Sequence, residues 1–496
     1  MDRVFVNRVE DPCKSVGLGS ISFQAAQFRA VLAQAATRAA QTGQATLASF
    51  VMPVPYYDPL QLLHVCQQFY AGNCFYWEQP SQQMALVGAG TALCLETDSA
   101  ARFAETALAV RTLSAEAVLA SDPTYHGSVS QGPVLFGGFS FDLLHPRTPL
   151  WHDFPAGLLI LPTLLFSHQQ QQVTCTLSQL VRATDDLDSL TNSMSVQLAE
   201  ILRQVPALPR MAVPALGENQ EYRIRDLWPA EDWQRLVTKT THAIQQGDYA
   251  KVVLARAVQV VNDMQPFKLT AILQRLRQSY PAAYVFAFQR GSRTFLGATP
   301  ELLLYAQDGH LHTVALAGSA PRGVNEAEDR RLGSELLHSS KNRQEHEIVA
   351  SMMRSALAPL CTRVWVAETP ELLRLKNIQH LQTAIVGELQ PEHCILDALQ
   401  TLHPTPAVGG SPTEAALAYI RAHEHLDRGW YAGPIGWVDL QGNGAFAVAL
   451  RSALLEERQA TLFAGCGIVA DSEPEAEYAE SCLKLQVMLR SLSGEE

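Results

Sequence analysis

The sequence lacks the features that mark several classes of protein. Its net charge is -12, and no cluster of Lys or Arg offsets this locally, which argues against a general nucleic-acid-binding protein. The nine cysteines include no C-x-x-C pair, so we expect reduced thiols rather than a disulfide framework or a zinc site. No apolar stretch is long enough to span a bilayer, and the N-terminus lacks the apolar core of a signal peptide. We therefore expect a soluble, cytoplasmic protein that binds neither membranes nor nucleic acid.

Motifs of the nucleotide-binding and hydrolytic enzymes are absent as well. No G-x-G-x-x-G follows a strand-like run and no G-x-x-x-x-G-K-[ST] occurs, so nucleotide binding is not indicated. There is no G-x-S-x-G motif, and the Cys and His residues occur in no nucleophile motif. The segment HEH, residues 423–425, has no third metal ligand nearby, and we interpret it as part of the surface.

The residues that are present indicate a large protein of mixed helices and strands. The chain has 496 residues, of which 47% are hydrophobic and 17% charged, which suits a folded protein with an extensive core. Strand-like runs outnumber helical ones, and several follow each other directly, which favours antiparallel sheets over a doubly wound parallel sheet. A segment rich in Pro and Ala, residues 204–219, divides the sequence into an N-terminal half, 1–205, and a C-terminal half, 219–496.

A lysine stands at the beginning of one predicted strand. The run DYAKVVLARAV, residues 248–258, places Lys251 directly before β-branched and other apolar residues. A lysine in such a position either extends its ammonium group to water or is kept desolvated for a chemical step. The run by itself favours the first interpretation.

Two predicted helices carry carboxylates on faces that also hold apolar residues. In SSKNRQEHEIVASMMRSAL, Glu345 lies one and two turns before apolar residues, which predicts that it belongs to the buried stripe. Near the C-terminus, Glu477, Glu480 and Lys484 are spaced by three and four residues on one helical face. Each helix alone favours a solvated acidic edge. Together they suggest a shared oxygen-ligand site for Mg²⁺, which binds one or two carboxylates plus substrate and water.

Three glycine-containing segments are suited to the close approach of a ligand to the backbone. They are LHPTPAVGGSPTEAA, WYAGPIGWVD and FAGCGIVAD, residues 402–416, 430–439 and 463–471. Exposed glycine N–H groups can hold a carboxylate. An ordinary loop is an equally open interpretation of each segment.

These segments, in this order, resemble those of the chorismate-utilising enzymes, the isochorismate, salicylate, anthranilate and aminodeoxychorismate synthases. The similarity extends over residues 220–492 and includes YAKVVLAR, FLGATPELLL, SSKNRQEHEIV, LHPTPAVGG, RGWYAGPIGWVD and AGCGIVADSEPEAEYAESCLK. In the N-terminal half, LASFVMPVPYYDPL, FYWEQP and FGGFSFD resemble the isochorismate synthase branch. The resemblance implies one large chorismate-binding α+β fold, with two antiparallel sheets packed face to face and helices outside. The segment near residue 210 then joins two halves of one fold.

The resemblance also implies roles in an Mg²⁺-dependent conversion of chorismate to isochorismate. Lys251 would be the base that activates water for attack at C2, with its pKa lowered by burial. Glu301 would be the general acid that protonates the departing C4 hydroxyl. Glu345 and Glu480, with Glu477 in support, would hold Mg²⁺ against the ring carboxylate of the substrate.

Five further residues would bind the substrate if the resemblance holds. Arg451 matches an arginine whose planar fork suits a carboxylate. Lys484 and the amides of Gly465 and Gly467 would also bind carboxylate, and His403 would hydrogen-bond near the C4 hydroxyl. The substrate chorismate is the expected small-molecule partner. We expect a monomer without a glutaminase subunit, because water rather than ammonia is the nucleophile.

Two positions bear on which product is released. Ala407 stands where relatives that also eliminate pyruvate usually carry Thr, which favours release of isochorismate, whereas Tyr431 is common in those relatives. We expect isochorismate, for menaquinone, phylloquinone or siderophore-type synthesis, because tyrosine also occurs in synthases of the menaquinone type. The alternatives are a salicylate synthase that also eliminates pyruvate and a catalytically inactive regulatory homologue. Asn342, where Asp is common, and Cys466, where Ala is common, are departures that leave the acid–base pair intact.

Overall fold

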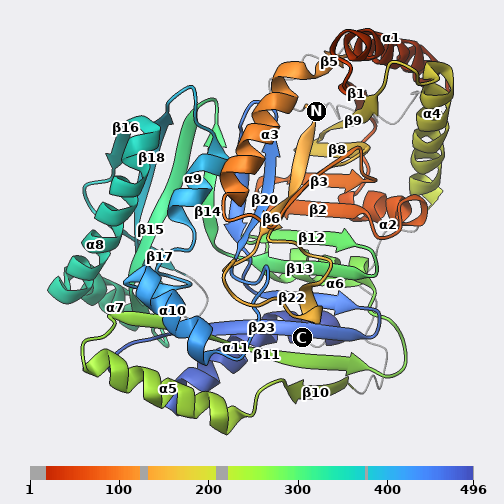
Figure 1. Cartoon of the computed structure of the whole chain (residues 1–496). Coiled ribbons are helices and arrows are strands. Elements are labelled where there is room, and N and C mark those ends of the chain that lie inside the picture. Colours follow the sequence, from red (N-terminus) through yellow and green to blue (C-terminus); the bar gives the residue numbers. More distant parts are fainter. Residues whose placement is uncertain (1–17, 123–131, 208–221, 375–377, 495–496) are drawn as a thin grey trace, which may run out of the picture.

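Apolar and β-branched runs form the strands of two large sheets, and amphipathic segments form helices that cover them (Figure 1). The computed structural model describes residues 18–122, 132–207, 222–374 and 378–494. The predicted fold class, an α+β fold of two antiparallel sheets packed face to face with helices outside, is confirmed. The Pro- and Ala-rich segment predicted as a junction lies mostly within residues 208–221, which are outside the described residues.

The larger sheet has 13 strands, all paired in antiparallel fashion except β1 and β5, which are parallel. In spatial order they are β10 (Tyr222–Asp226), β11 (Lys251–Asn262), β23 (Gln459–Ile468), β22 (Ser452–Glu456), β13 (Arg293–Thr299), β12 (Tyr284–Arg290), β2 (Cys74–Gln79), β3 (Met84–Ala89), β8 (Leu164–Gln169), β9 (Gln172–Val181), β1 (Thr46–Val54) and β5 (Val118–Ser121). The two-residue strand β19 (Gly410–Ser411) pairs with the beginning of β11.

The smaller sheet has ten strands and is antiparallel in each of its pairings. In spatial order they are β16 (Cys361–Val366), β18 (Ile378–Leu389), β15 (His310–Pro321), β14 (Leu302–Gln307), β21 (Gly444–Val448), β20 (Pro434–Asp439), β6 (Val134–Phe139), β7 (Gly157–Leu161) and β4 (Leu93–Thr97). The short strand β17 (Glu371–Arg374) pairs with β18.

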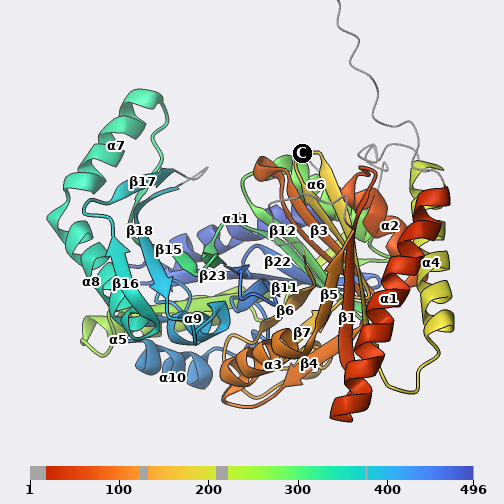
Figure 2. The same cartoon turned by 90° about the horizontal axis from the view of Figure 1, so that it is seen from above.

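Eleven α-helices in the described residues surround the sheets. They are α1 (Leu18–Thr42), α2 (Pro59–Phe69), α3 (Arg102–Glu116), α4 (Leu187–Gln204), α5 (Ala230–Gln245), α6 (Leu269–Ser279), α7 (Glu326–His338), α8 (Ser340–Leu357), α9 (Ile395–Leu402), α10 (Thr413–His423) and α11 (Pro474–Ser493). Figure 2 shows α1, α2 and α4 at one side of the molecule and α7 and α8 at the other, beside β15–β18.

The core consists of two layers, one on each face of the larger sheet. The inter-sheet layer contains a cluster of mutually packed aromatic rings, Trp151, Phe154, Phe288, Phe295 and Trp430, each at most 2% exposed. The second layer lies between the larger sheet and helices that include α1, α2, α4, α6 and α11. Burial of an aromatic or aliphatic side chain contributes about 1.5–3 kcal/mol, so these layers dominate the stability of the fold.

Each sheet contains strands from both sides of residue 210. In the larger sheet β2 pairs with β12, and in the smaller sheet β6 pairs with β20. Beside the first of these pairings, Arg277 of α6 donates hydrogen bonds to Asp58 (2.7 Å), to Glu78 (2.9 Å) and to the Tyr76 hydroxyl (2.9 Å). A charged side chain of the C-terminal half is therefore neutralised by carboxylates of the N-terminal half.

Two further features of the described residues concern membrane-spanning helices and the state of the cysteines. In those ranges no helix combines the length and the apolarity that a bilayer crossing requires. The eight cysteines in the same ranges are free thiols, and six of them are buried.

Candidate active site

Lys251 is the first residue of β11, where two glycine-containing segments meet. On one side β11 pairs with β23, and on the other Lys251 lies opposite Ser411 of β19. The backbone N–H groups of Ala250 and Val253 donate to Ser411 O (2.8 Å) and Gly409 O (3.1 Å). The strand end that carries the lysine is thus held between the segments 402–416 and 463–471.

Two glycines allow the lysine to lie close to the neighbouring backbone. A Cβ atom at Gly467 would lie 2.5 Å from Cε of Lys251 and 3.2 Å from its Nζ. A Cβ atom at Gly465 would lie 3.1 Å from the hydroxyl oxygen of Tyr431. Gly465 and Gly467 are two residues apart on β23, so their Cβ positions would lie on the same face of the strand. The lysine and the tyrosine therefore lie on one face of the larger sheet. The Lys251 and Tyr431 side chains therefore occupy the space that a side chain at Gly467 or Gly465 would need.

Lys251 and Glu301 lie within electrostatic range of each other, and their pKa values shift in opposite directions. Burial lowers the pKa of Lys251, although the carboxylates of Glu345 and Glu301 oppose this shift. Burial raises the pKa of Glu301, and the nearby charges of Lys251, Arg451 and Lys484 oppose that shift. Both pKa shifts are in the direction that suits a general base and a general acid.

Arg451 has a backbone conformation that is unusual for its type. Its φ of +48° lies in the left-handed region, which costs a non-glycine residue about 1–3 kcal/mol unless the surroundings enforce it. Its carbonyl accepts a hydrogen bond from the N–H of Ala298 (3.2 Å), so the turn between β21 and β22 is tied to β13. Strained residues of this kind cluster at functional sites, and the Arg451 charge acts on both Glu301 and Tyr431.

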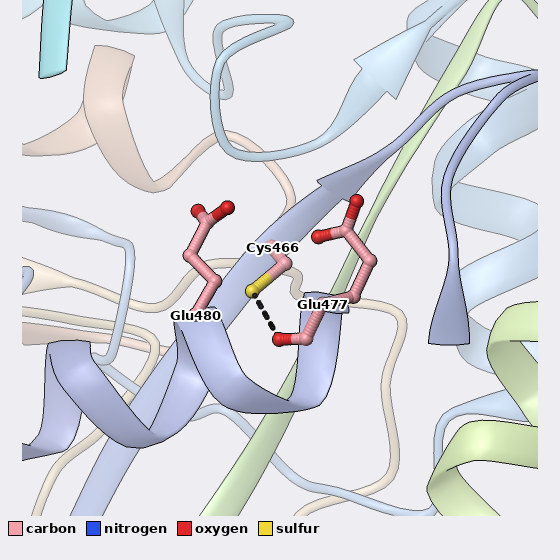
Figure 3. Close-up of side chains that lie close together, drawn as sticks. All are labelled: Cys466, Glu477 and Glu480. Atoms are coloured by element: carbon pink, nitrogen blue, oxygen red, sulfur yellow. Dashed lines mark hydrogen bonds between the residues drawn. The ribbon is translucent and has the colours of Figure 1, made fainter. Parts of the chain in front are cut away.

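The first turns of α11 bring two carboxylates to the end of β23 (Figure 3). Lys484 Nζ contacts Glu480 Oε1 at 2.6 Å and donates to Gly465 O at 2.8 Å. Glu477 accepts a hydrogen bond from Ser472 Oγ (2.6 Å), and burial raises the pKa of Glu477. The face of α11 predicted from the three- and four-residue spacing is therefore directed at the glycine strand.

Glu345 does not belong to the buried stripe of α8, so that part of the prediction was wrong. The stripe is centred one residue later, on His346, which is 2% exposed, whereas Glu345 is exposed. The His346 ring is satisfied by Ala317 O (3.1 Å) and Thr383 Oγ1 (2.6 Å), so a polar residue occupies a core-facing position that an apolar pattern does not reveal. The Glu345 charge nevertheless acts on Lys251 across the site.

His403 contacts the N-terminal half of the chain. Its Nε2 is 3.0 Å from Phe141 O, and the nearby charge of Arg102 acts on the ring. Burial lowers the pKa of His403 to about 3, so the ring is neutral. A neutral ring that donates to a main-chain carbonyl holds residues 402–416 against the N-terminal half.

Two other residues expected to bind substrate, Tyr431 and Ala407, differ in burial. Tyr431 is 3% exposed and stacks on Phe463 with ring centroids 5.2 Å apart. Burial raises its pKa, and the positive charges of Arg428 and Arg451 oppose the shift. Ala407 is partly buried in the loop that precedes β19.

His380, on β18, belongs to the same electrostatic cluster although the sequence analysis did not single it out. Burial lowers its pKa, and the charges of Lys251 and Lys484 lower it further. Its Nδ1 lies 2.7 Å from Ser319 Oγ on the paired strand β15. The only signal in the sequence is a histidine inside the strand-like run NIQHLQTAIV, and a single polar residue there gives no indication of its distant neighbours.

The segment HEH, interpreted as surface, is only partly so: His425 is exposed and His423 is half-buried, but Glu424 between them is 2% exposed. Both carboxylate oxygens of Glu424 accept hydrogen bonds from Arg428 (2.6 Å each), and one also accepts from the N–H of Ala255 in β11 (2.7 Å). Arg428 in turn donates to Val253 O (2.7 Å) and Val408 O (3.1 Å). This buried pair cross-links the lysine strand to the loop 402–416.

Comparisons with known proteins find relatives that match most of the chain. A family model described as chorismate binding enzyme matches residues 32–493. Isochorismate synthase MenF of Bacillus subtilis is 37% identical over 474 residues, which cover 94% of this chain and 98% of that protein. The salicylate biosynthesis isochorismate synthase of Pseudomonas aeruginosa is 40% identical over 443 residues, 88% of each chain. The solved structure of MenF, the menaquinone-specific isochorismate synthase from Escherichia coli, has a TM-score of 0.72 at 26% identity and covers 93% of this chain and 100% of that one.

Proposed function

The chain belongs to the chorismate binding enzyme family, and from this membership we propose that it is an isochorismate synthase, which converts chorismate to isochorismate. The observation that carries the proposal is one electrostatic cluster in which burial lowers the pKa of Lys251 and raises the pKa of Glu301. The two shifts favour a base and an acid within one cluster, as addition of water and loss of a hydroxyl require.

The proposed reaction uses each group for one proton transfer. Neutral Lys251 Nζ takes a proton from water as the water oxygen forms a bond to C2 of chorismate. The ring double bond shifts as the C4–O bond breaks, and Glu301 gives its proton to the departing hydroxyl, which leaves as water. The proposed reaction begins with a neutral lysine and a protonated carboxyl, and burial shifts the pKa of Lys251 down and that of Glu301 up, in the directions that favour these forms.

Mg²⁺ is the proposed cofactor, and the carboxylates of Glu345, Glu480 and Glu477 are the proposed ligands. These carboxylates suit Mg²⁺, because the ion prefers oxygen ligands. The charges of Glu345 and Glu480 both act on Lys251, which supports their placement around the same part of the site. When bound, the ion supplies a Lewis acid that clamps the ring carboxylate of the substrate. Lys484, already paired with Glu480, neutralises part of the negative charge that accumulates there.

The remaining site residues are proposed to orient the substrate. Arg451 is proposed to bind a carboxylate of the substrate beside Glu301, and the backbone N–H groups of Gly465 and Gly467 are proposed to bind a carboxylate next to Lys251. His403 is proposed to hydrogen-bond near the C4 hydroxyl of the substrate, and its contact with Phe141 O ties its loop to the N-terminal half. We further propose a cytoplasmic monomer in which residues 1–205 and 219–496 form one catalytic unit without a glutaminase.

The test is incubation of the purified protein with chorismate and Mg²⁺, followed by chromatographic identification of the product. We expect isochorismate, and we expect Lys251→Ala and Glu301→Gln each to lower turnover by about 10²–10⁴-fold. Lys239→Ala, an exposed lysine on α5, is the matched control and should retain full activity. Unchanged chorismate hydration in Lys251→Ala would contradict the proposed base.

A second candidate is a salicylate synthase, favoured by the buried Tyr431 beside Gly465. We expect isochorismate to accumulate instead, because Ala407 has no hydroxyl with which to hold the enolpyruvyl group in a reactive geometry. Salicylate fluorescence measured on the same reaction distinguishes the two. Stoichiometric salicylate and pyruvate would overturn the assignment of product.

A further inference from the structure

A cysteine thiol lies between the two carboxylates of α11. The Sγ of Cys466 and carboxylate oxygens of Glu477 and Glu480 all lie within 4.8 Å of one another (Figure 3). Within the described ranges this is the one group of three such side chains with that spacing. Cys466 belongs to β23, and its side chain points toward α11, away from the face that Gly465 and Gly467 leave open to Lys251.

The thiol differs in chemistry from the carboxylates around it. Mg²⁺ takes oxygen ligands, whereas a thiolate with carboxylates suits softer divalent cations such as Zn²⁺ and Co²⁺. Cys466 is fully buried and its S–H donates to the main-chain oxygen of Glu477 (3.3 Å), so the sulfur is held at the base of the site. Glu477 is half-buried and Glu480 is exposed, so an ion can enter from the solvent side.

We propose that this cluster binds a thiophilic divalent cation through Cys466, Glu477 and Glu480, and that the bound ion excludes Mg²⁺ and stops turnover. The inhibition rests on the proposed function, because Glu480 is shared with the proposed Mg²⁺ site. On binding, a metal–sulfur bond forms, the thiol S–H bond breaks and its proton passes to solvent. Glu480 exchanges its ion pair with Lys484 for the metal, and Lys484 keeps its hydrogen bond to Gly465 O.

Binding is tested with Co²⁺, because a thiolate ligand gives cobalt a sulfur-to-metal charge-transfer absorption that oxygen ligands do not give. We expect this absorption when Co²⁺ is added to the wild-type protein without Mg²⁺, and we expect Cys466→Ala to abolish it. Cys482→Ala is the matched control, since Cys482 lies on α11 with Glu477 and Glu480 but its sulfur contacts Arg256. The control should keep the absorption.

Inhibition is tested by titrating Zn²⁺ into the chorismate assay at fixed Mg²⁺. We expect excess Mg²⁺ to relieve the inhibition, and we expect Cys466→Ala to keep its activity but to require at least about tenfold more Zn²⁺. Equal Zn²⁺ inhibition of wild type and Cys466→Ala, or no charge-transfer absorption in wild type, overturns the proposal. A protein that turns over no chorismate yet shows the cysteine-dependent absorption would contradict the proposed function and leave the metal site standing.

Discussion

The substitution Gly467→Ala should displace the proposed base, Lys251, without destabilising the fold. The added methyl group would lie 2.5 Å from Cε of Lys251, so the side chain must retreat by roughly 1 Å to reach the ~3.5–4.0 Å at which carbon atoms normally touch. Gly467 has no positive φ, so alanine is compatible with the backbone of β23. The clash involves the flexible end of a lysine and no backbone atom.

Gly467→Ala should affect the rate of turnover far more than the stability of the fold. A displacement of about 1 Å at a reacting group costs on the order of 10²-fold in rate, because proton transfer needs a near-attack geometry. The free energy of unfolding should change by less than about 1 kcal/mol, since the lysine can adopt another rotamer at the edge of the site. We therefore expect turnover to collapse in a protein that unfolds at nearly the wild-type temperature.

The assay pairs steady-state turnover of chorismate with thermal unfolding followed by circular dichroism. Gly409→Ala is the matched control, because its Cβ would meet neighbours only at 3.5 Å or more, in ordinary van der Waals contact. The control should retain activity and stability. If Gly467→Ala turned over chorismate at the wild-type rate, Lys251 could not be the base in the position that the structure gives it.

Three further outcomes are expected. Arg428→Met leaves Glu424 as an unpaired buried charge, so urea unfolding should show a loss of about 3–5 kcal/mol, and a loss below 1 kcal/mol would contradict the buried pair. The kcat/KM profile should be bell-shaped: activity falls at low pH as Lys251, whose pKa is lowered, takes up a proton, and at high pH as Glu301, whose pKa is raised, loses one. Glu480→Gln should abolish Mg²⁺-dependent turnover and leave the unfolding temperature unchanged, whereas full activity in excess chelator would exclude a metal role.

Local patterns in the sequence predict the elements and the fold class but not the neighbours of each strand. The apolar run after Lys251 predicts a strand that begins there, and β11 does begin at that residue. Nothing in the same run indicates that β23, two hundred residues later, lies on one side of it. The alternation of apolar and polar residues determines which face of a strand is buried, whereas the neighbouring strand with which it pairs depends on the whole topology.

Polar groups inside the core are the part that pattern reasoning misses. His346 and Glu424 are both 2% exposed, yet an apolar-stripe argument assigns such residues to the surface. Glu424 is paired with Arg428 four residues later, but both buried residues also need partners far away in the sequence, Thr383 for His346 and Ala255 for Glu424. Because a buried polar group is tolerated only where its partners are, its location depends on tertiary contacts that a single segment does not contain.

The pairing of β6 with β20 and of β2 with β12 has a consequence for synthesis on the ribosome. About 300 residues separate β6 from β20, so at ~5–20 residues per second the earlier strand waits about 15–60 s for its partner. During that time the N-terminal half exposes unpaired strand edges that can associate with other chains. A nascent chain stopped before residue 434 should therefore aggregate or remain bound to chaperones, and the first half of this protein depends on them until the last strands emerge.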